Sequence, residues 1–518
     1  MEITQGLRRA VQVRPHGPST VFRERCRTWG ETGERVARLA SGMIDLGLAK
    51  GGRSAILALN SDRYFEYLLA VPMAGAAVVP INIRLAAPEI QYILEDSGAE
   101  ILFIDDRFAP VLDTLKGQMP GVRHVIYLGD GVLPTGMRGY EDLLHRPPLT
   151  QPLACDDDLA GIFYTGGTTG KAKGVMLSHR NLVVNAANVI PAFGYDAATV
   201  YLHAGPMFHL ADGASTLAVT ITGGVHVFVQ AFDPADVLAT VQREKVTHSL
   251  LVPTMINLLV NFPKIADYDV STLKRVAYGA SPMPEAVLRK ALAMLPGVRF
   301  AQAYGMTEAA PLVTALDPRY TVLEGPDAKR VKSCGQAGHL VEVRIADAQD
   351  REVPRCTVGE VQARGDNIML GYWNMPDLTV QALRGGWYHT GDAGYMDEDG
   401  FVYIVDRLKD MIITGGENVY SAEVENAIST LEGVAEVAVI GIPDETWGEA
   451  VHAIVVPRAG WTLSQEQVVA HCHTLIAGYK CPRSVTIRNE PMPISGAGKI
   501  LKTTLRAPYW AGREKLVN

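Results

Sequence analysis

Apolar and polar positions follow a regular order along the first half of the chain. Short apolar runs with the length of buried strands alternate with segments whose apolar residues recur at helical spacing. We expect strands at 54–60, 76–82, 100–106, 159–165, 247–253 and 273–279, with helices at 63–75 and 88–98. Strands and helices that take turns in this way predict parallel βαβ units. Ligands in such sheets bind where the carboxyl ends of strands meet loops.

The pattern changes near residue 338, where shorter strands with period-two alternation and turn residues begin. GHLVEVRIAD, GEVQARG, GWYHTGD and GFVYIVD predict antiparallel hairpins in a β-rich subdomain at about 335–406, and the last two are joined by the turn 397–400. The charged pentapeptide 406–410 then separates this part from about a hundred residues with their own strands and helices. The prediction is an α/β protein with an N-terminal domain at 1–406 and a small α+β C-terminal domain at 407–518.

Composition narrows the kinds of partner. Of 518 residues, 47% are apolar and 20% charged, and the formal net charge of -8 contains no long run of either sign. This argues against a surface for nucleic acid or anionic membrane and favours small molecules. The six cysteines form no Cys-x-x-Cys pair, which suits a reducing compartment, and we expect a cytoplasmic protein. The most apolar stretch, 67–81, is broken by prolines and too short to span a membrane, and the start lacks the apolar core of a signal peptide.

The stretch YTGGTTGKAKG at 164–174 holds four glycines, three threonines and two lysines. A Walker loop requires Ser or Thr after its Gly-Lys, but Ala172 follows Gly170-Lys171, so this is not a Walker loop. Backbone N–H groups, hydroxyls and ammonium groups are all donors for phosphate oxygens. Composition alone also fits a Gly-rich surface loop.

Three further segments carry groups suited to a nucleotide. In QAYGMTE, Tyr304 offers a stacking face, Thr307 a hydroxyl and Glu308 a carboxylate for Mg²⁺. In YHTGD, Asp392 can accept hydrogen bonds from two ribose hydroxyls. In GAGK, Lys499 stands on a glycine-rich loop. Taken singly, each has an ordinary alternative: a buried Tyr beside a turn, an Asp that forms a turn, and a solvated Lys.

Five motifs occur together and in a fixed order: YTGGTTGKAKGV, QAYGMTE, YHTGD, VDRLKDMIITGGENVYSAEVE, and GYKCPRSV leading into PISGAGKILKTTLR. In this combination the chain resembles the adenylate-forming superfamily of acyl-CoA synthetases, nonribosomal adenylation domains and luciferases. It is most similar to bacterial fatty-acid or aryl-acid CoA ligases. The resemblance extends from about residue 25 to 507.

The resemblance implies a site for ATP and Mg²⁺. The residues implied to bind the β- and γ-phosphates are Thr165, Gly166, Gly167, Thr168, Thr169, Gly170, Lys171 and Lys173. Glu308 is implied to bind Mg²⁺. The residues implied to bind adenosine and the α-phosphate are Gly279, Ala280, Ser281, Ala303, Tyr304, Gly305, Met306, Thr307, Asp392 and Arg407. Lys499 would bridge the substrate carboxylate and the α-phosphate. The family usually has Ser where this chain has Gly166, so one hydroxyl donor is missing.

The implied reaction has two steps. A carboxylic acid attacks ATP to give acyl-AMP and pyrophosphate, and a thiol then takes the acyl group. For the second step the mobile C-terminal domain would rotate about a hinge at about 407–410, with Lys409 as pivot. Gly415, Gly416, Glu417 and Asn418 would then line the channel for the pantetheine arm of CoA. Tyr479, Lys480 and Arg483 would meet the CoA phosphates, and a solvated basic surface is the alternative there.

The acyl pocket is expected at 206–209, the helix that follows, 278–280, Ala303 and the residues around Met306. These segments are mostly apolar, which favours a medium- or long-chain fatty acid or an aryl or arylpropenoic acid. His209 is expected beside the substrate carboxylate, with a packed core His as the alternative. The direction of Asp212 is open. Lys499, Glu308, Thr165 and His209 are the expected catalytic residues.

Several alternatives stay open. An acyl-AMP ligase that loads a carrier protein would share most of these residues, and a pseudoenzyme could bind ATP without turnover. The sequence leaves the oligomeric state open, with a homodimer among the alternatives. Pro493 lies six residues before Lys499, a pattern similar to that read by lysine acetyltransferases of this family, and acetylation would remove the Lys499 charge.

Overall fold

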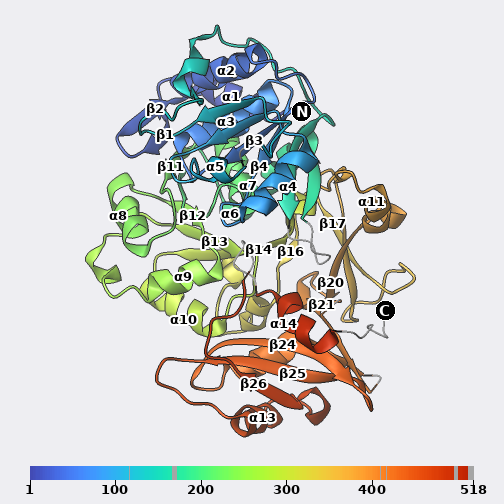
Figure 1. Ribbon diagram of the computed structural model, residues 1–518. Helices are drawn as coiled ribbons and strands as arrows, with labels where there is room; N and C mark the ends of the chain where they lie inside the picture. The colour runs from blue at the N-terminus through green and yellow to red at the C-terminus, as the bar shows by residue number, and fades with distance from the viewer. Residues whose placement is uncertain (116, 166–171, 409, 416, 495–499, 512–518) are drawn as a thin grey trace. The chain divides into compact units, whose positions relative to one another are not determined.

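The computed structural model describes the chain except for residues 116, 166–171, 409, 416, 495–499 and 512–518 (Figure 1). The described chain packs as two compact units. The first comprises residues 1–343 and 363–388, and the second comprises 344–362 and 389–518. No helix in the described ranges is both long enough and apolar enough to cross a membrane.

One sheet of the first unit has the strand order β19-β9-β8-β4-β3-β5-β6-β7. Its strands are β3 (Arg53–Leu57), β4 (Ala77–Pro80), β5 (Ile101–Ile104), β6 (His124–Tyr127), β7 (Arg138–Gly139), β8 (Leu159–Thr165), β9 (Lys173–Ser178) and β19 (Gly371–Tyr372). Helices α3 (Asp62–Met73) and α4 (Ala87–Ser97) connect β3, β4 and β5, which pair in parallel. The predicted βαβ units are confirmed. Strands β8 and β9 instead pair antiparallel.

The other sheet of this unit has the order β16-β15-β14-β13-β12-β10-β11-β1-β2. Its strands are β1 (Pro18–Phe22), β2 (Arg25–Thr28), β10 (Val200–His203), β11 (Val225–Phe228), β12 (His248–Leu250), β13 (Arg275–Gly279), β14 (Arg299–Gly305), β15 (Leu312–Leu316) and β16 (Gln336–Ala337). The short apolar run PGVRF at 296–300, just before QAYGMTE, predicts a strand that ends at Phe300. In the structure β14 continues to Gly305 because residues 302–305 also pair with β15.

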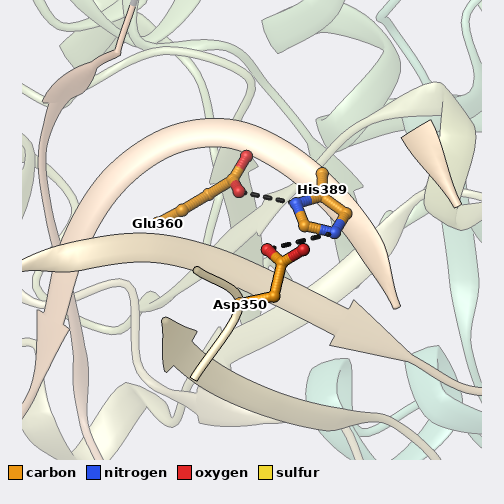
Figure 2. A group of neighbouring side chains, drawn as sticks. All are labelled: Asp350, Glu360 and His389. Atoms are coloured by element: carbon orange, nitrogen blue, oxygen red, sulfur yellow. Dashed lines mark hydrogen bonds and ion pairs between the residues drawn. The ribbon is translucent and has the colours of Figure 1, made fainter. Parts of the chain in front are cut away.

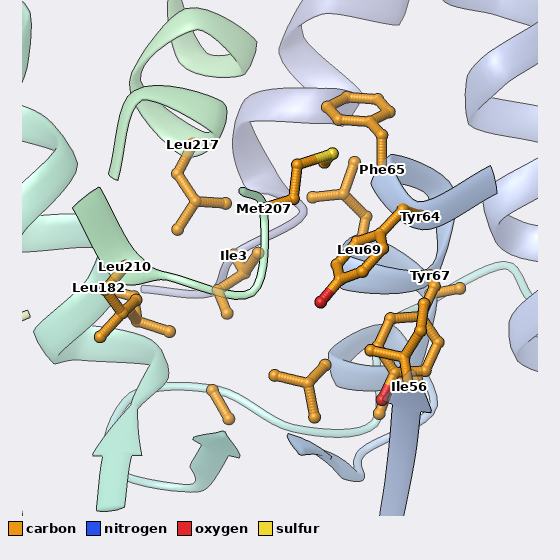
Figure 3. Packing of buried hydrophobic residues seen from close by; sticks show 14 of the residues in the cluster. Ile3, Ile56, Tyr64, Phe65, Tyr67, Leu69, Leu182, Met207, Leu210 and Leu217 are labelled. Atoms are coloured by element: carbon orange, nitrogen blue, oxygen red, sulfur yellow. The ribbon is translucent and has the colours of Figure 1, made fainter. Parts of the chain in front are cut away.

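Helices pack these sheets into apolar clusters. Side chains of α2 (Trp29–Asp45), α3, α6 (His179–Phe193) and α7 (Leu210–Thr222) meet with the N-terminal segment in the largest cluster, part of which Figure 3 shows. A second cluster joins α8 (Pro234–Glu244), α9 (Pro253–Val260) and α10 (Glu285–Met294) to strands β10, β11, β13 and β14. Local caps fix the helix starts: Ser178 accepts from the Asn181 N–H at the start of α6, and Ser61 accepts from Tyr64 at the start of α3.

The predicted hairpins lie mostly in the second unit. Strands β17 (Glu342–Ala346), β18 (Gly359–Arg364), β20 (Tyr388–Met396) and β21 (Val402–Arg407) form one sheet, and β20 and β21 are antiparallel neighbours. A further sheet contains β22 (Ile412–Thr414), β23 (Glu417–Val419), β24 (Val434–Asp444), β25 (Gly448–Pro457) and β26 (Ser484–Ile487). Its helices are α12 (Ser421–Ser429), α13 (Gln465–His473) and α14 (Lys502–Trp510).

Residues 389–406 belong to the same compact unit as the C-terminal residues. The domain boundary at 406/407 and the hinge at about 407–410 stay predictions, and Lys409 lies outside the described residues. The remaining helices are α1 (Gln5–Val13), α5 (Val111–Leu115) and α11 (Pro376–Ala382).

Candidate functional site

The glycine-rich stretch connects the two strands of a hairpin. β8 ends at Thr165 and β9 begins at Lys173, and these two residues are opposite one another in the ladder. A Walker loop joins a strand to a helix, whereas here both sides of the loop are strands, in agreement with the exclusion made from Ala172. Gly166, Gly167, Thr168, Thr169, Gly170 and Lys171 lie outside the described residues, so their roles stay predictions.

Helix α4 holds both ends of this loop. The Tyr164 hydroxyl donates to Asp96 Oδ2 at 2.6 Å, and the Tyr92 hydroxyl donates to the Ala172 carbonyl at 3.2 Å. Trp373 Nε1 donates to the backbone carbonyl of Asp96 at 2.8 Å. Burial raises the pKa of Tyr164, and the Asp96 carboxylate acts in the same direction, so the phenol stays protonated and donates. The two strand ends are thereby fixed where the loop begins and ends.

The residues predicted to frame adenine come together at the ends of two neighbouring strands. β13 and β14 are parallel, with Gly279 opposite Ala303. A Cβ on Gly279 would lie 2.3 Å from the Ala303 carbonyl oxygen, so only glycine fits there. Ala280 follows with a φ of 66° and turns the chain toward Ser281. Adjacent parallel strands that end at one edge are the usual position of a nucleotide in such sheets.

Glu308 lies in a short 3-10 turn just beyond β14. Its backbone carbonyl accepts from the Met369 N–H at 2.9 Å, and its side-chain Oε1 accepts from the Tyr372 hydroxyl at 2.9 Å. The Lys173 ammonium lies 5.4 Å from the centroid of the Tyr372 ring. Tyr372 therefore touches both a predicted metal ligand and a predicted phosphate ligand. Burial raises the pKa of the Tyr372 phenol, and the Glu308 carboxylate adds to this.

The donor set around Glu308 fits a hard cation. Mg²⁺ prefers oxygen ligands and commonly takes one or two protein carboxylates together with phosphate oxygens and water. A carboxylate has two oxygens, and the phenol engages one of them. Sequence patterns did not indicate Tyr372, although an aromatic residue after Gly371 in GYW was the signal available.

In the second unit, Asp392 and Arg407 are opposite one another on β20 and β21. The distance between Arg407 Nε and Asp392 Oδ1 is 3.5 Å. Asp392 is buried, whereas the Arg407 side chain is 47% exposed. The structure thus brings together the two residues predicted to bind ribose.

A polar cluster missed by sequence reasoning holds the turn before Asp392. Figure 2 shows the His389 ring between two carboxylates: Nδ1 lies 2.6 Å from Glu360 Oε2, and Nε2 lies 3.8 Å from Asp350 Oδ1. The Gly391 N–H donates to Glu360 Oε1 at 3.1 Å. The two ring nitrogens face different carboxylates, and the imidazole bridges them. Glu360 therefore fixes the backbone that carries Asp392.

The residues predicted to meet CoA gather partly around Trp447. A Cβ on Gly415, whose φ is 60°, would lie 2.6 Å from Trp447 Cε3, and the Arg483 guanidinium lies 4.6 Å from the Trp447 ring centroid. The Trp447 side chain is 42% exposed. Lys480 instead pairs with Glu423 at 2.8 Å. Glu417 begins β23 and is exposed, as is Tyr479. Gly416 lies outside the described residues.

His209 occupies the N-cap position of α7, and the centroid of its ring lies 4.3 Å from that of Phe208. Met207 and Phe208 belong to the largest apolar cluster, whereas the Tyr278 side chain packs in the second cluster, on the other face of its strand. Asp212 points into the core: Oδ2 lies 2.6 Å from His203 Nδ1, and Oδ1 accepts from the Tyr201 hydroxyl at 3.0 Å. This settles the direction that the sequence left open. Lys499 lies outside the described residues.

Neighbouring parallel strands that end at one sheet edge, with a carboxylate and a lysine at one tyrosine, are the arrangement expected of an α/β protein that binds a nucleotide. The comparisons specify the class further. A family model described as "AMP-binding enzyme" matches residues 7–373, and "AMP-binding enzyme C-terminal domain" matches residues 423–499. The chain belongs to the AMP-binding enzyme family, within the adenylate-forming superfamily, and is an ATP-dependent member of its acyl-CoA synthetases.

Individual relatives cover almost the whole chain. A feruloyl-CoA synthase from Amycolatopsis sp is 38% identical over 97% of this chain and 98% of its own length. The fatty acid–[acyl-carrier-protein] ligase ScoC from Streptomyces coeruleorubidus is 34% identical over 98% of this chain and 96% of its own. The structure of ATP-bound MatB from Rhodopseudomonas palustris is 29% identical, with a TM-score of 0.87 and coverage of 98% and 99%.

Proposed function

We propose that the protein activates an apolar carboxylic acid with Mg²⁺-ATP and transfers the acyl group to CoA. The observation that carries this proposal is the meeting of Lys173 and Glu308 at Tyr372. In this proposal Lys173 binds phosphate and Glu308 binds the metal, and the contact of both residues with one side chain supports it.

The first step brings two anions together. The acid's carboxylate attacks the α-phosphorus of ATP, a P–O bond forms, and the bond to pyrophosphate breaks. Glu308 would hold Mg²⁺, whose charge would offset that of the phosphate oxygens. Thr165 and Lys173, with the loop between them, bind the β- and γ-phosphates, and Thr307 binds the α-phosphate. Lys499 bridges the carboxylate and the α-phosphate by electrostatic stabilisation.

The second step uses the C-terminal domain. The acyl-AMP mixed anhydride has AMP as its leaving group and is ready for attack by a thiolate. We propose rotation about Lys409, after which 415–417 line the pantetheine channel and Arg483 and Lys480 meet the CoA phosphates. The Lys480 ammonium would then exchange Glu423 for phosphate.

An apolar acid is the proposed substrate. The segments around Met207, Phe208 and Leu210 are apolar, and the Asp212 carboxylate is engaged by His203 and Tyr201 rather than directed at a substrate amine. The names of two relatives, a feruloyl-CoA synthase and a fatty-acid ligase, fit the aryl and aliphatic versions of this proposal. The carrier protein in the second name supports a second candidate, in which the thiol belongs to an acyl-carrier protein.

A panel of acids tests the proposal. Each acid is mixed with the enzyme, Mg²⁺ and ATP, and pyrophosphate is measured before and after addition of CoA, followed by product mass. Acid-dependent pyrophosphate and an acyl-CoA product are expected. Pyrophosphate without thioester, together with loading of a phosphopantetheinyl carrier protein, would favour the second candidate. If no acid in the panel causes release of pyrophosphate, the result would instead support an ATP-binding protein without turnover.

Two further points belong to the proposal. We propose a cytoplasmic location, which agrees with six cysteines that form no disulfide in the part of the chain that the structure describes. We also propose that acetylation of Lys499 switches off the first step, because it removes the positive charge. Intact-mass analysis after treatment with acetyl donor and a lysine acetyltransferase tests this, and an acetylated enzyme with full activity would refute it. Size-exclusion chromatography with light scattering decides between monomer and homodimer.

A further inference from the structure

Tyr372 is the side chain through which two parts of the proposed ATP site are connected. Its hydroxyl donates to Glu308 Oε1 at 2.9 Å, and its ring faces the Lys173 ammonium at 5.4 Å. Glu308 follows β14 in one sheet, whereas Lys173 begins β9 in the other. Resting on the proposed function, we infer that Tyr372 is a positioning residue that sets the Glu308 carboxylate and the Lys173 ammonium for Mg²⁺-ATP.

The backbone around Tyr372 is fixed on both sides. Leu370 N–H donates to the Met176 carbonyl at 3.0 Å and Trp373 N–H donates to the Gly174 carbonyl at 2.7 Å, which ties the segment to β9. Met369 N–H donates to the Glu308 carbonyl at 2.9 Å. One short segment is therefore bonded to the strand that carries Lys173 and to the residue that carries the metal-binding carboxylate.

The chemistry of the contacts differs at the two ends of the Tyr372 side chain. A glutamate side chain has several rotatable bonds, and a hydrogen bond to one oxygen restricts the direction of the other. Loss of an outer hydrogen bond to a metal-binding carboxylate typically costs 10- to 100-fold in metal affinity or activity. At the ring, the face of an aromatic side chain attracts an ammonium within about 6 Å and limits where it can lie.

A packing role is the competing explanation, because Tyr372 is only 8% exposed and belongs to the largest apolar cluster. Tyr372→Phe separates the two roles. Phenylalanine keeps the ring against Lys173 and the apolar packing but removes the donor to Glu308. Tyr67→Phe is the matched control, because it also removes one buried hydroxyl, which donates to the Ser54 carbonyl.

The primary measurement is Mn²⁺ binding to the full-length protein in the presence of ATP, followed by electron paramagnetic resonance with no acid added. We expect Tyr372→Phe to weaken Mn²⁺ binding about 10- to 100-fold while Tyr67→Phe does not. A parallel titration of pyrophosphate release should show a correspondingly higher half-saturating Mg²⁺ concentration. Tyr372→Leu, which also removes the ring, should raise the KM for ATP beyond the value for Tyr372→Phe.

Wild-type Mn²⁺ binding and Mg²⁺ dependence in Tyr372→Phe would overturn the inference and leave packing as the role. Equal weakening in Tyr67→Phe would do the same, because any loss of a buried hydroxyl would then suffice. If Tyr372→Phe is less stable, its Mn²⁺ binding is also measured in a Glu308→Gln background. If the tyrosine substitution weakens Mn²⁺ binding there by the same factor, Tyr372 does not act through Glu308. Mn²⁺ binding needs no turnover, so its outcome is separate from a failed acid panel, which would refute only the proposed function.

Discussion

Glu360 and His389 are joined by a 2.6 Å contact between carboxylate Oε2 and imidazole Nδ1, three residues before the predicted ribose ligand Asp392. The other carboxylate oxygen accepts from the Gly391 N–H at 3.1 Å. Gly391 has a φ of 70°, a left-handed conformation that glycine adopts readily. One partly buried carboxylate thus holds the turn that directs the next side chain, Asp392.

Replacement of this carboxylate should weaken ATP binding. Glu360→Gln replaces one carboxylate oxygen with an NH₂ group, which cannot accept a hydrogen bond. One of the two hydrogen bonds, from the His389 ring or from the Gly391 N–H, is therefore lost. A hydrogen bond to a charged group contributes about 1.5–3 kcal/mol, and we expect the KM for ATP to rise at least about 10-fold with little change in kcat. Initial rates of pyrophosphate release at varied ATP measure this. Glu342→Gln, at an exposed ion pair with Arg364, should leave the KM unchanged, and equal effects in both variants would contradict the prediction.

Lys499→Ala should impair the first step selectively. The ammonium offsets charge that develops when the carboxylate approaches the α-phosphate, and loss of one such group typically costs about 100- to 1000-fold in rate. ATP affinity and thioester formation from synthetic acyl-AMP should change little, which stopped-flow and product assays can measure separately. The exposed Lys264→Ala is the control. An equal loss in both half-reactions would mean that Lys499 has a general role instead.

Gly166→Ser should restore the hydroxyl that the family usually has. One hydrogen bond contributes about 1 kcal/mol, so pyrophosphate-side binding should tighten by about fivefold. The KM for ATP and product inhibition by pyrophosphate report this change. Gly297→Ser, at a position with open space around a Cβ, serves as the control. If neither parameter moves, the missing hydroxyl has no consequence in this chain.

Asp212→Ala should reduce stability strongly. Asp212 is 1% exposed and accepts from Tyr201 while facing His203, whose Nε2 in turn lies 2.9 Å from His226 Nδ1. Removal of one partner from a buried pair typically costs about 3–5 kcal/mol. Urea unfolding measures the loss, with the exposed Asp236→Ala expected within about 0.5 kcal/mol of wild type. A small effect at Asp212 would mean that its neighbours find other partners.

The regular part of the fold could be predicted from the sequence because the strands of the first unit are short, apolar and separated by helices. β8 was predicted at its observed bounds, since Tyr164 and Thr165 end an apolar run just before a glycine-rich loop. The end of β14 was not predicted. Residues 302–305 are held as strand by antiparallel pairing with β15, a contact that local periodicity does not report.

There are physical reasons why sequence patterns did not indicate several residues of the site. β19 has two residues, too few for a period-two pattern, so the contact of Tyr372 with Glu308 and Lys173 could not be read from alternation. Helix α7 is buried on most sides, so its apolar pattern gave no direction for Asp212. Glu360 follows a glycine at the start of a strand, where a carboxylate ordinarily faces solvent, and only the folded turn at His389 shows its partner.

Acid should destabilise the protein through histidines that burial keeps neutral. Burial lowers the pKa of His179 to about 4, and the Ile3 N–H donates to its Nδ1, which must be unprotonated to accept. An unfolded histidine has a pKa of about 6.5, so below that pH the unfolded chain binds a proton that the folded chain binds only near pH 4. Stability from the neutral ring is therefore present above about pH 6.5 and lost as the pH falls toward 4. Between pH 7 and pH 5 the loss is about 2 kcal/mol.

His179→Asn, which keeps an acceptor for Ile3, should flatten this dependence in urea unfolding, and the exposed His16→Asn should not. A wild-type pH dependence in His179→Asn would show that other groups govern acid unfolding.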